Sequence, residues 1–180
     1  MTKKKIQWHP GFYAAMRLDF KKYDGLHFEE EYQLTKKPLE VDLLIIKKLV
    51  NTIIDNSLGR RFSQYNIFEY KSPGDHNFDV FALYQGVCYA SYYCANEKTR
   101  DVTLFLVTSK NNFNLIKWLR KNLKEIEIDN AAPGVYDVKG SPLFKMCIVI
   151  TEELDPKEYE WITKLRKNLS REQVEQNIEN

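Results

Sequence analysis

The sequence has few cysteines and histidines, and it lacks a glycine-rich phosphate loop. The three cysteines are an odd number without the paired spacing of a zinc site, so we expect reduced thiols, buried in a cytoplasmic protein. The three histidines have no metal-ligand spacing and no serine or cysteine nucleophile beside them. Without a phosphate loop, nucleotide-triphosphate chemistry is unsupported. These residues are Cys88, Cys94 and Cys147, and His9, His27 and His76.

Long hydrophobic runs and a strong charge of either sign are absent as well. No apolar run approaches the length of a membrane span, and none follows the basic residues at the N-terminus, so we expect no membrane contact and no signal peptide. The net charge of +2 is lower than a constitutive nucleic-acid binder usually shows, although local basic patches remain available to an enzyme.

The most informative stretch runs from residue 38 to residue 89 and contains two apolar pieces interrupted by charge, residues 39–46 and 66–71. Continuous Val, Ile and Leu runs of this length are typical of strands covered on both faces. Because side chains alternate along a strand, Glu40 and Asp42 share one face, and Glu69 and Lys71 share one face of the other strand. If the two strands are neighbours, these charges converge.

Such a convergence suits a metal site. Carboxylates held close together repel each other unless a cation joins them, and oxygen ligands favour Mg²⁺ or Mn²⁺. A lysine beside the metal can orient an attacking water or stabilise charge that develops on a phosphate. The pattern therefore favours metal-assisted phosphodiester chemistry.

Asp42 is followed 27 residues later by the triplet Glu69-Tyr70-Lys71. This pattern resembles the signature of the PD-(D/E)XK nuclease superfamily. The resemblance implies that Asp42 and Glu69 bind the metal, that the carbonyl of Tyr70 is an additional ligand and that Lys71 positions or activates water. Val41 stands where the proline of the family's name would be. Glu40, in phase with Asp42, is a reserve carboxylate.

The next segment is predicted to be a helix over residues 78–95, with apolar residues at three- and four-residue spacings. Gln85 and Tyr89 are i,i+4 neighbours, so both face the same way. The pair resembles the Q-x-x-x-Y motif of the RecB-like and phage-exonuclease-like branch of the superfamily. There, the two residues help to hold substrate and catalytic residues.

Other interpretations of these residues stay open. Glu69 and Lys71 can be the polar face of an edge strand, and Gln85 and Tyr89 can be ordinary helix packing. Extra acids and basic residues near the site are further candidates: Asp19, Glu29, Glu30 or Glu31 for the metal, and Arg60 and Arg61 for phosphate or for pairing with surface acids.

The predicted architecture is α/β, with a mixed central sheet flanked by helices on both faces, as in restriction-endonuclease-like cores. A helix at residues 8–24, three strands, a helix and a strand form the core expected within residues 1–125. Residues 126–180 form a C-terminal α+β extension packed on that core, in a single domain. Part of the segment after residue 48 is expected to continue its strand at Ile53 and Ile54.

The function expected from the resemblance is metal-dependent hydrolysis of DNA with Mg²⁺ or Mn²⁺. The chain is most similar to small bacterial members of the superfamily, some of them linked to transposases or mobile elements. DNA is the expected partner, and a homodimer is compatible with a terminal helix that has few apolar residues. The alternatives are a catalytically weak or inactive module of the same fold that binds nucleic acid or protein, and an unrelated α/β protein in which Glu69 and Lys71 form an exposed ion pair.

Overall fold

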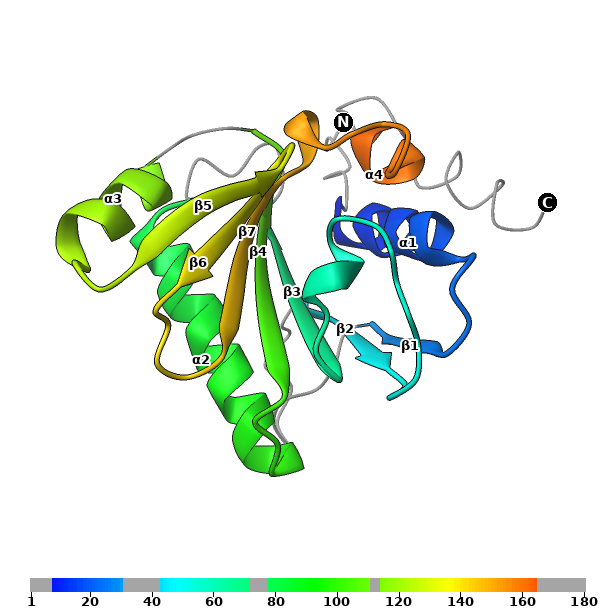
Figure 1. Cartoon of the computed structure of the whole chain (residues 1–180), viewed down its shortest axis with the longest axis horizontal. Coiled ribbons are helices and arrows are strands. Elements are labelled where there is room, and N and C mark those ends of the chain that lie inside the picture. The colour runs from blue at the N-terminus through cyan, green and yellow to red at the C-terminus, as the bar shows by residue number, and fades with distance from the viewer. Residues whose placement is uncertain (1–7, 31–42, 72–77, 111–113, 165–180) are drawn as a thin grey trace, which may run out of the picture.

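The structure, a computed structural model, describes residues 8–30, 43–71, 78–110 and 114–164 (Figure 1). These residues form one seven-stranded sheet with the order β1-β2-β3-β4-β7-β6-β5. β3, β4 and β7 are parallel, and the other neighbours are antiparallel. The strands are β1 (Leu26–Glu29), β2 (Leu43–Lys48), β3 (Tyr65–Lys71), β4 (Val102–Thr108), β5 (Glu127–Ala132), β6 (Val135–Lys139) and β7 (Lys145–Ile150).

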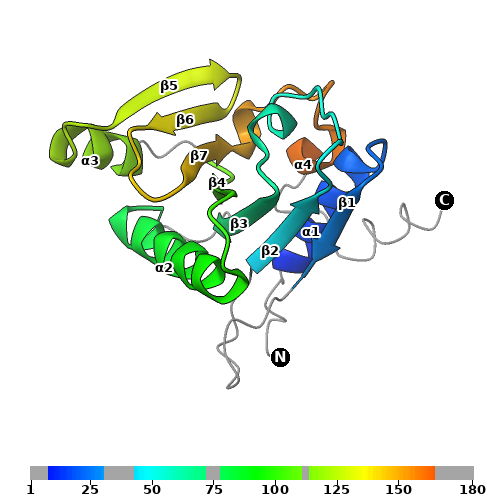
Figure 2. The ribbon, with the colours of Figure 1, turned by 60° about the horizontal axis from the view of Figure 1, so that its bottom comes forward.

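Helices cover both faces of this mixed sheet, so the predicted fold class is confirmed (Figure 2). The helices are α1 (Trp8–Phe20), α2 (Val80–Glu97), α3 (Asn114–Asn122) and α4 (Glu160–Lys164), with 3-10 turns η1 (Gly59–Arg61) and η2 (Thr151–Glu153). The order α1, β1, β2, β3, α2, β4 is the predicted order of helix, three strands, helix and strand. The residues after 125 prolong the same sheet, because β7 pairs with β4.

The centre of the sheet separates two cores. Every residue of β4 is buried, as expected for a strand of apolar residues covered on both sides. On one face, α2 and α3 cover Leu104 and Leu106 of this strand. On the other face, α1 and α4 cover an aromatic layer in which Phe12 stacks on Tyr70 with ring centres 4.4 Å apart.

Small residues let α2 lie close to the sheet. Ala82, Gly86 and Ala90, spaced by four, are buried against it, and a Cβ built at Gly86 would lie 2.6 Å from Cδ2 of Leu106. Leu83 and Tyr93 are buried on the same side, whereas Phe81, Tyr84 and Tyr92 face outward. Cys88 is exposed, so the prediction that all three cysteines are buried is wrong for this residue.

The segment after β2 also differs from its prediction. β2 ends at Lys48, and the expected continuation of the strand at Ile53 and Ile54 is wrong. The pairing with β1 ends where the backbone N–H of Leu49 donates to the carbonyl of Gly25, and a turn follows in which the N–H of Thr52 donates to the carbonyl of Leu49. The predicted terminal helix lies outside the described residues. None of the helices in the described ranges is long and apolar enough to cross a membrane.

Candidate functional site

Four of the predicted site residues lie together where α2 packs beside β3. Glu69 and Lys71, two residues apart on β3, point to the same face of the sheet, and Gln85 and Tyr89 project from α2 beside them. The Nζ atom of Lys71 lies 2.8 Å from Oε1 of Glu69 and donates to Oε1 of Gln85 at 2.6 Å. Nε2 of Gln85 donates to the hydroxyl of Tyr89 at 2.7 Å. An uninterrupted chain of polar contacts thus joins all four side chains.

The donors and acceptors of the four side chains determine the direction of each hydrogen bond in this series. The lysine ammonium has donors only, so the oxygen of the Gln85 amide must face Lys71 and its nitrogen must face Tyr89. The Tyr89 hydroxyl therefore accepts from Gln85 and keeps its own proton to donate. Lys71 has three N–H donors, and Glu69 and Gln85 take two of them among the described residues. Within the described part of the chain, one ammonium N–H thus has no acceptor.

The burial of the Glu69–Lys71 pair decides between the interpretations of these two residues. β3 lies between β2 and β4, so the edge-strand interpretation is wrong. The side chains of Lys71 and Glu69 are 17% and 5% exposed, so the interpretation as an exposed ion pair is wrong as well. A carboxylate so well shielded from water needs a cation beside it, which Lys71 supplies.

Tyr70, between the two charged residues, faces the opposite side of the sheet. Its ring is buried against Phe12, and burial raises the pKa of its hydroxyl. Its carbonyl lies 3.2 Å from Nε2 of His9, the second residue of α1. Sequence spacing gave no sign of this contact, because 61 positions separate the two residues and α1 reaches β3 only through the tertiary fold.

Asp42 and Glu40 lie outside the described residues. Leu43, the residue after Asp42, is the first described residue of β2 and pairs directly with Glu69 in the antiparallel register. In the described ranges, no group of three or more histidine, cysteine, aspartate or glutamate side chains could hold a metal ion. Of the predicted ligands, Glu69 and the carbonyl of Tyr70 are described. Their oxygen donors are of the kind that Mg²⁺ takes, since this ion is commonly held by one or two carboxylates and retains several waters.

The other acids proposed for the metal have different contacts. Asp19 accepts the backbone N–H groups of Trp161 and Ile162 at 2.9 and 2.8 Å, so it caps α4. Glu29 pairs with Lys47 at 2.8 Å, and Glu30 pairs with Arg17 at 2.9 Å. Glu31 lies outside the described residues.

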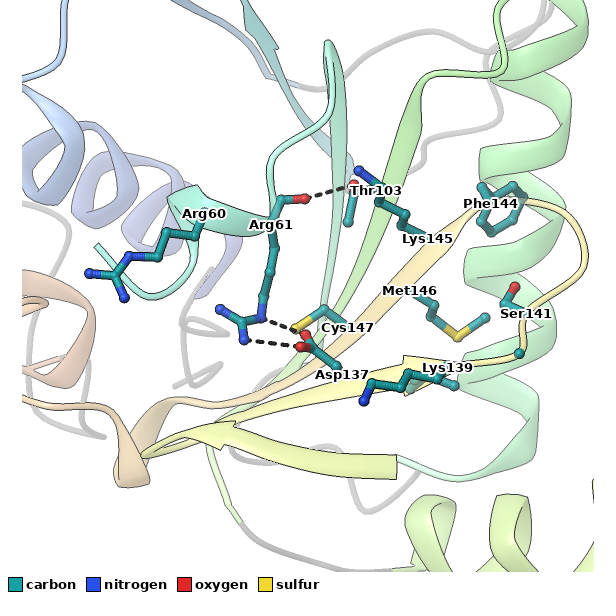
Figure 3. A pocket seen from close by; sticks show the side chains of 12 residues that line it. Arg60, Arg61, Thr103, Asp137, Lys139, Ser141, Phe144, Lys145, Met146 and Cys147 are labelled. Atoms are coloured by element: carbon teal, nitrogen blue, oxygen red, sulfur yellow. Dashed lines mark hydrogen bonds and ion pairs between the residues drawn. The ribbon is translucent and has the colours of Figure 1, made fainter. Parts of the chain in front are cut away.

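A cavity of about 440 Å³ lies at the opposite end of β4 and β7, beside Thr103 and Lys145 (Figure 3). Its wall includes Arg61, whose Nε and Nη2 atoms contact the Asp137 carboxylate at 2.5 and 3.0 Å. In Figure 3, the side chain of Arg60 extends away from this pair. Arg61 therefore pairs with an acid, as one of the two interpretations predicted, and the cavity is separate from Lys71, which pairs with the last residue of β4.

Comparisons of the chain with protein-family models, with curated proteins and with solved structures found no match.

Proposed function

We propose that this chain is a Mg²⁺- or Mn²⁺-dependent nuclease that hydrolyses phosphodiester bonds of DNA. The observation that carries the proposal is the position of Lys71, whose ammonium is held between the Glu69 carboxylate and the Gln85 amide. Among the described residues, no acceptor takes its third N–H. The order of the elements around it, α1, three strands, α2 and β4, is the order that the PD-(D/E)XK resemblance requires. Three cysteines without a disulfide agree with a cytoplasmic location.

Each residue of the site has a separate role in this proposal. Glu69 and Asp42 would hold the metal ion, with the Tyr70 carbonyl as a further ligand. When bound, the ion would supply Lewis-acid stabilisation of the phosphoryl group. Lys71 directs its remaining N–H to the attacking water or to a phosphoryl oxygen. Gln85 holds Lys71 in place, and the Tyr89 hydroxyl donates to the substrate.

The test is cleavage of linear duplex, single-stranded and supercoiled DNA with Mg²⁺ or Mn²⁺, for the wild type and for Lys71→Ala. We expect metal-dependent cleavage that falls by about 10²–10³-fold in the variant, because a fixed donor to developing charge is lost. Lys47→Ala is the matched control, since Lys47 also lies on a strand of the sheet and pairs with a carboxylate at 2.8 Å.

Cleavage by Lys71→Ala at the wild-type rate would overturn the assignment of Lys71. An absence of metal-dependent cleavage in the wild type would overturn the nuclease and favour the alternative, a module of this fold that binds without catalysis. Equal losses in Lys71→Ala and Lys47→Ala would point to a general effect on folding instead of chemistry.

A further inference from the structure

Exposed aromatic rings gather on the outer surface of α2, next to the candidate site. Phe81 and Tyr84 are 70% and 56% exposed, and their rings meet edge to face with centres 6.2 Å apart. Tyr84 meets Trp118 of α3 in the same way at 6.4 Å. We call Phe81, Tyr84 and Trp118 the aromatic ladder. Trp118 is half-buried and packs against the core, whereas Phe81 and Tyr84 are exposed. Neighbouring apolar rings at a surface are typical of sites that bind a ligand.

The ladder begins beside the polar chain of the candidate site. Phe81 precedes Gln85 by four residues, so the two side chains are neighbours on one flank of α2. Gln85 in turn contacts Lys71. A ligand that lies across Phe81 is thus within one helical turn of the residue whose amide positions the Lys71 ammonium.

Positive charge borders the far end of the ladder. α3 carries Lys117, Arg120 and Lys121 and no acidic residue. Lys117 and Lys121 are exposed, flank Trp118 in the helix and form no ion pair with any other described residue. The surface therefore offers apolar rings beside cations that have no ion-pair partner among the described residues. This combination complements a polyanion that carries aromatic rings.

Single-stranded DNA has this chemistry. Unpaired bases present their faces for stacking on aromatic side chains, whereas a duplex hides those faces in its own base stack. We propose that the aromatic ladder is a stacking platform for unpaired bases, and that the substrate of the Lys71 site is single-stranded DNA or a frayed end of a duplex. This inference rests on the proposed nuclease function and names its substrate class.

The test measures binding without catalysis. Fluorescence anisotropy gives the dissociation constants of a labelled single-stranded oligonucleotide and of a duplex of the same sequence. Both are measured in EDTA, for the wild type and for Phe81→Ala/Tyr84→Ala. We expect the wild type to bind the single strand more tightly than the duplex. The double variant should bind the single strand at least about tenfold more weakly, because stacking of each base contributes about 5- to 150-fold to the affinity. Its affinity for the duplex should change little.

Tyr92→Ala is the matched control, because Tyr92 is 40% exposed on the same helix but lies outside the ladder. It should leave both dissociation constants unchanged, and Tyr84→Phe should retain the preference for the single strand. Equal affinity for both DNAs in the wild type, or equal weakening of both in the double variant, would overturn the platform.

The outcome is independent of the cleavage assay. Ladder-dependent binding of single strands without metal-dependent cleavage would retain the platform and refute the nuclease. Cleavage that depends on Lys71 but is insensitive to Phe81→Ala/Tyr84→Ala would retain the nuclease and refute the platform.

Discussion

At the scale of single residues, the function proposed for Lys71 depends on how its neighbours limit its motion. A lysine side chain has many rotamers, and fixing it costs conformational entropy. Contacts with Glu69 on one side and Gln85 on the other fix the position of the ammonium before any substrate binds. Such preorganisation is what makes a donor effective toward charge that appears only in the transition state. Under the proposed function, Gln85 is in this sense a positioning residue.

Asp19 gives a prediction about pH. Desolvation is the largest effect on this partly buried carboxyl and raises its pKa from 3.8 to about 6, although two backbone N–H groups of α4 and the Lys164 ammonium favour the charged form. Since the folded protein binds this proton more tightly than the unfolded chain does, the contribution of Asp19 to stability is complete below about pH 4. It is lost as the pH rises through 6.

Urea unfolding of the wild type and of Asp19→Asn from pH 4 to pH 7 checks this contribution. The free energy of unfolding of the wild type, relative to that of the variant, should fall as the pH rises across this range. A relative free energy that rises with pH would show that the two backbone hydrogen bonds outweigh the desolvation of the carboxylate.

At the scale of elements, Gly86 controls how closely α2 approaches the sheet, and so where Gln85 meets Lys71. A Cβ at this position would lie 2.6 Å from Leu106 Cδ2, in a core where Leu106 is fully buried. Gly86→Val should therefore lower the free energy of unfolding by about 1–3 kcal/mol through overpacking. Ala95→Val, at an exposed position of the same helix, should cost less than about 0.7 kcal/mol. Urea unfolding measures both, and equal effects would contradict a role of Gly86 in packing.

The elements also show which features a sequence can predict. Apolar runs and i,i+4 spacing were enough to place Glu69 and Lys71 on a strand and Gln85 and Tyr89 on the following helix. They were not enough to orient that helix. A stripe of large apolar residues normally marks the buried side of a helix. On α2, however, the small residues Ala82, Gly86 and Ala90 face the sheet. The stripe with the aromatic residues faces outward; its exposed members are Phe81, Tyr84, Cys88 and Tyr92. The contact of His9 with the Tyr70 carbonyl depends on tertiary packing, which no local pattern encodes.

At the scale of the whole molecule, metal binding should appear as stability. An ion that binds only the folded chain raises the free energy of unfolding by about 1.4 kcal/mol at ten times its dissociation constant. For a chain of this size, that is a rise in melting temperature of about 3–5 °C. We expect Mn²⁺ to produce this rise and EDTA to reverse it. Glu69→Gln and Asp42→Asn should each abolish the rise, because each removes a carboxylate of the proposed site.

Lys71→Ala separates metal binding from catalysis in the same experiment. The ammonium lies 2.8 Å from Glu69 Oε1 and competes with a metal ion for that carboxylate. Its removal should leave the Mn²⁺-dependent rise in melting temperature intact or enlarge it, whereas cleavage of DNA is lost. A rise that persists in Glu69→Gln would place the metal elsewhere on the molecule. A rise that disappears in Lys71→Ala would mean that the lysine holds the site together, so that its effect on cleavage could not be assigned to chemistry.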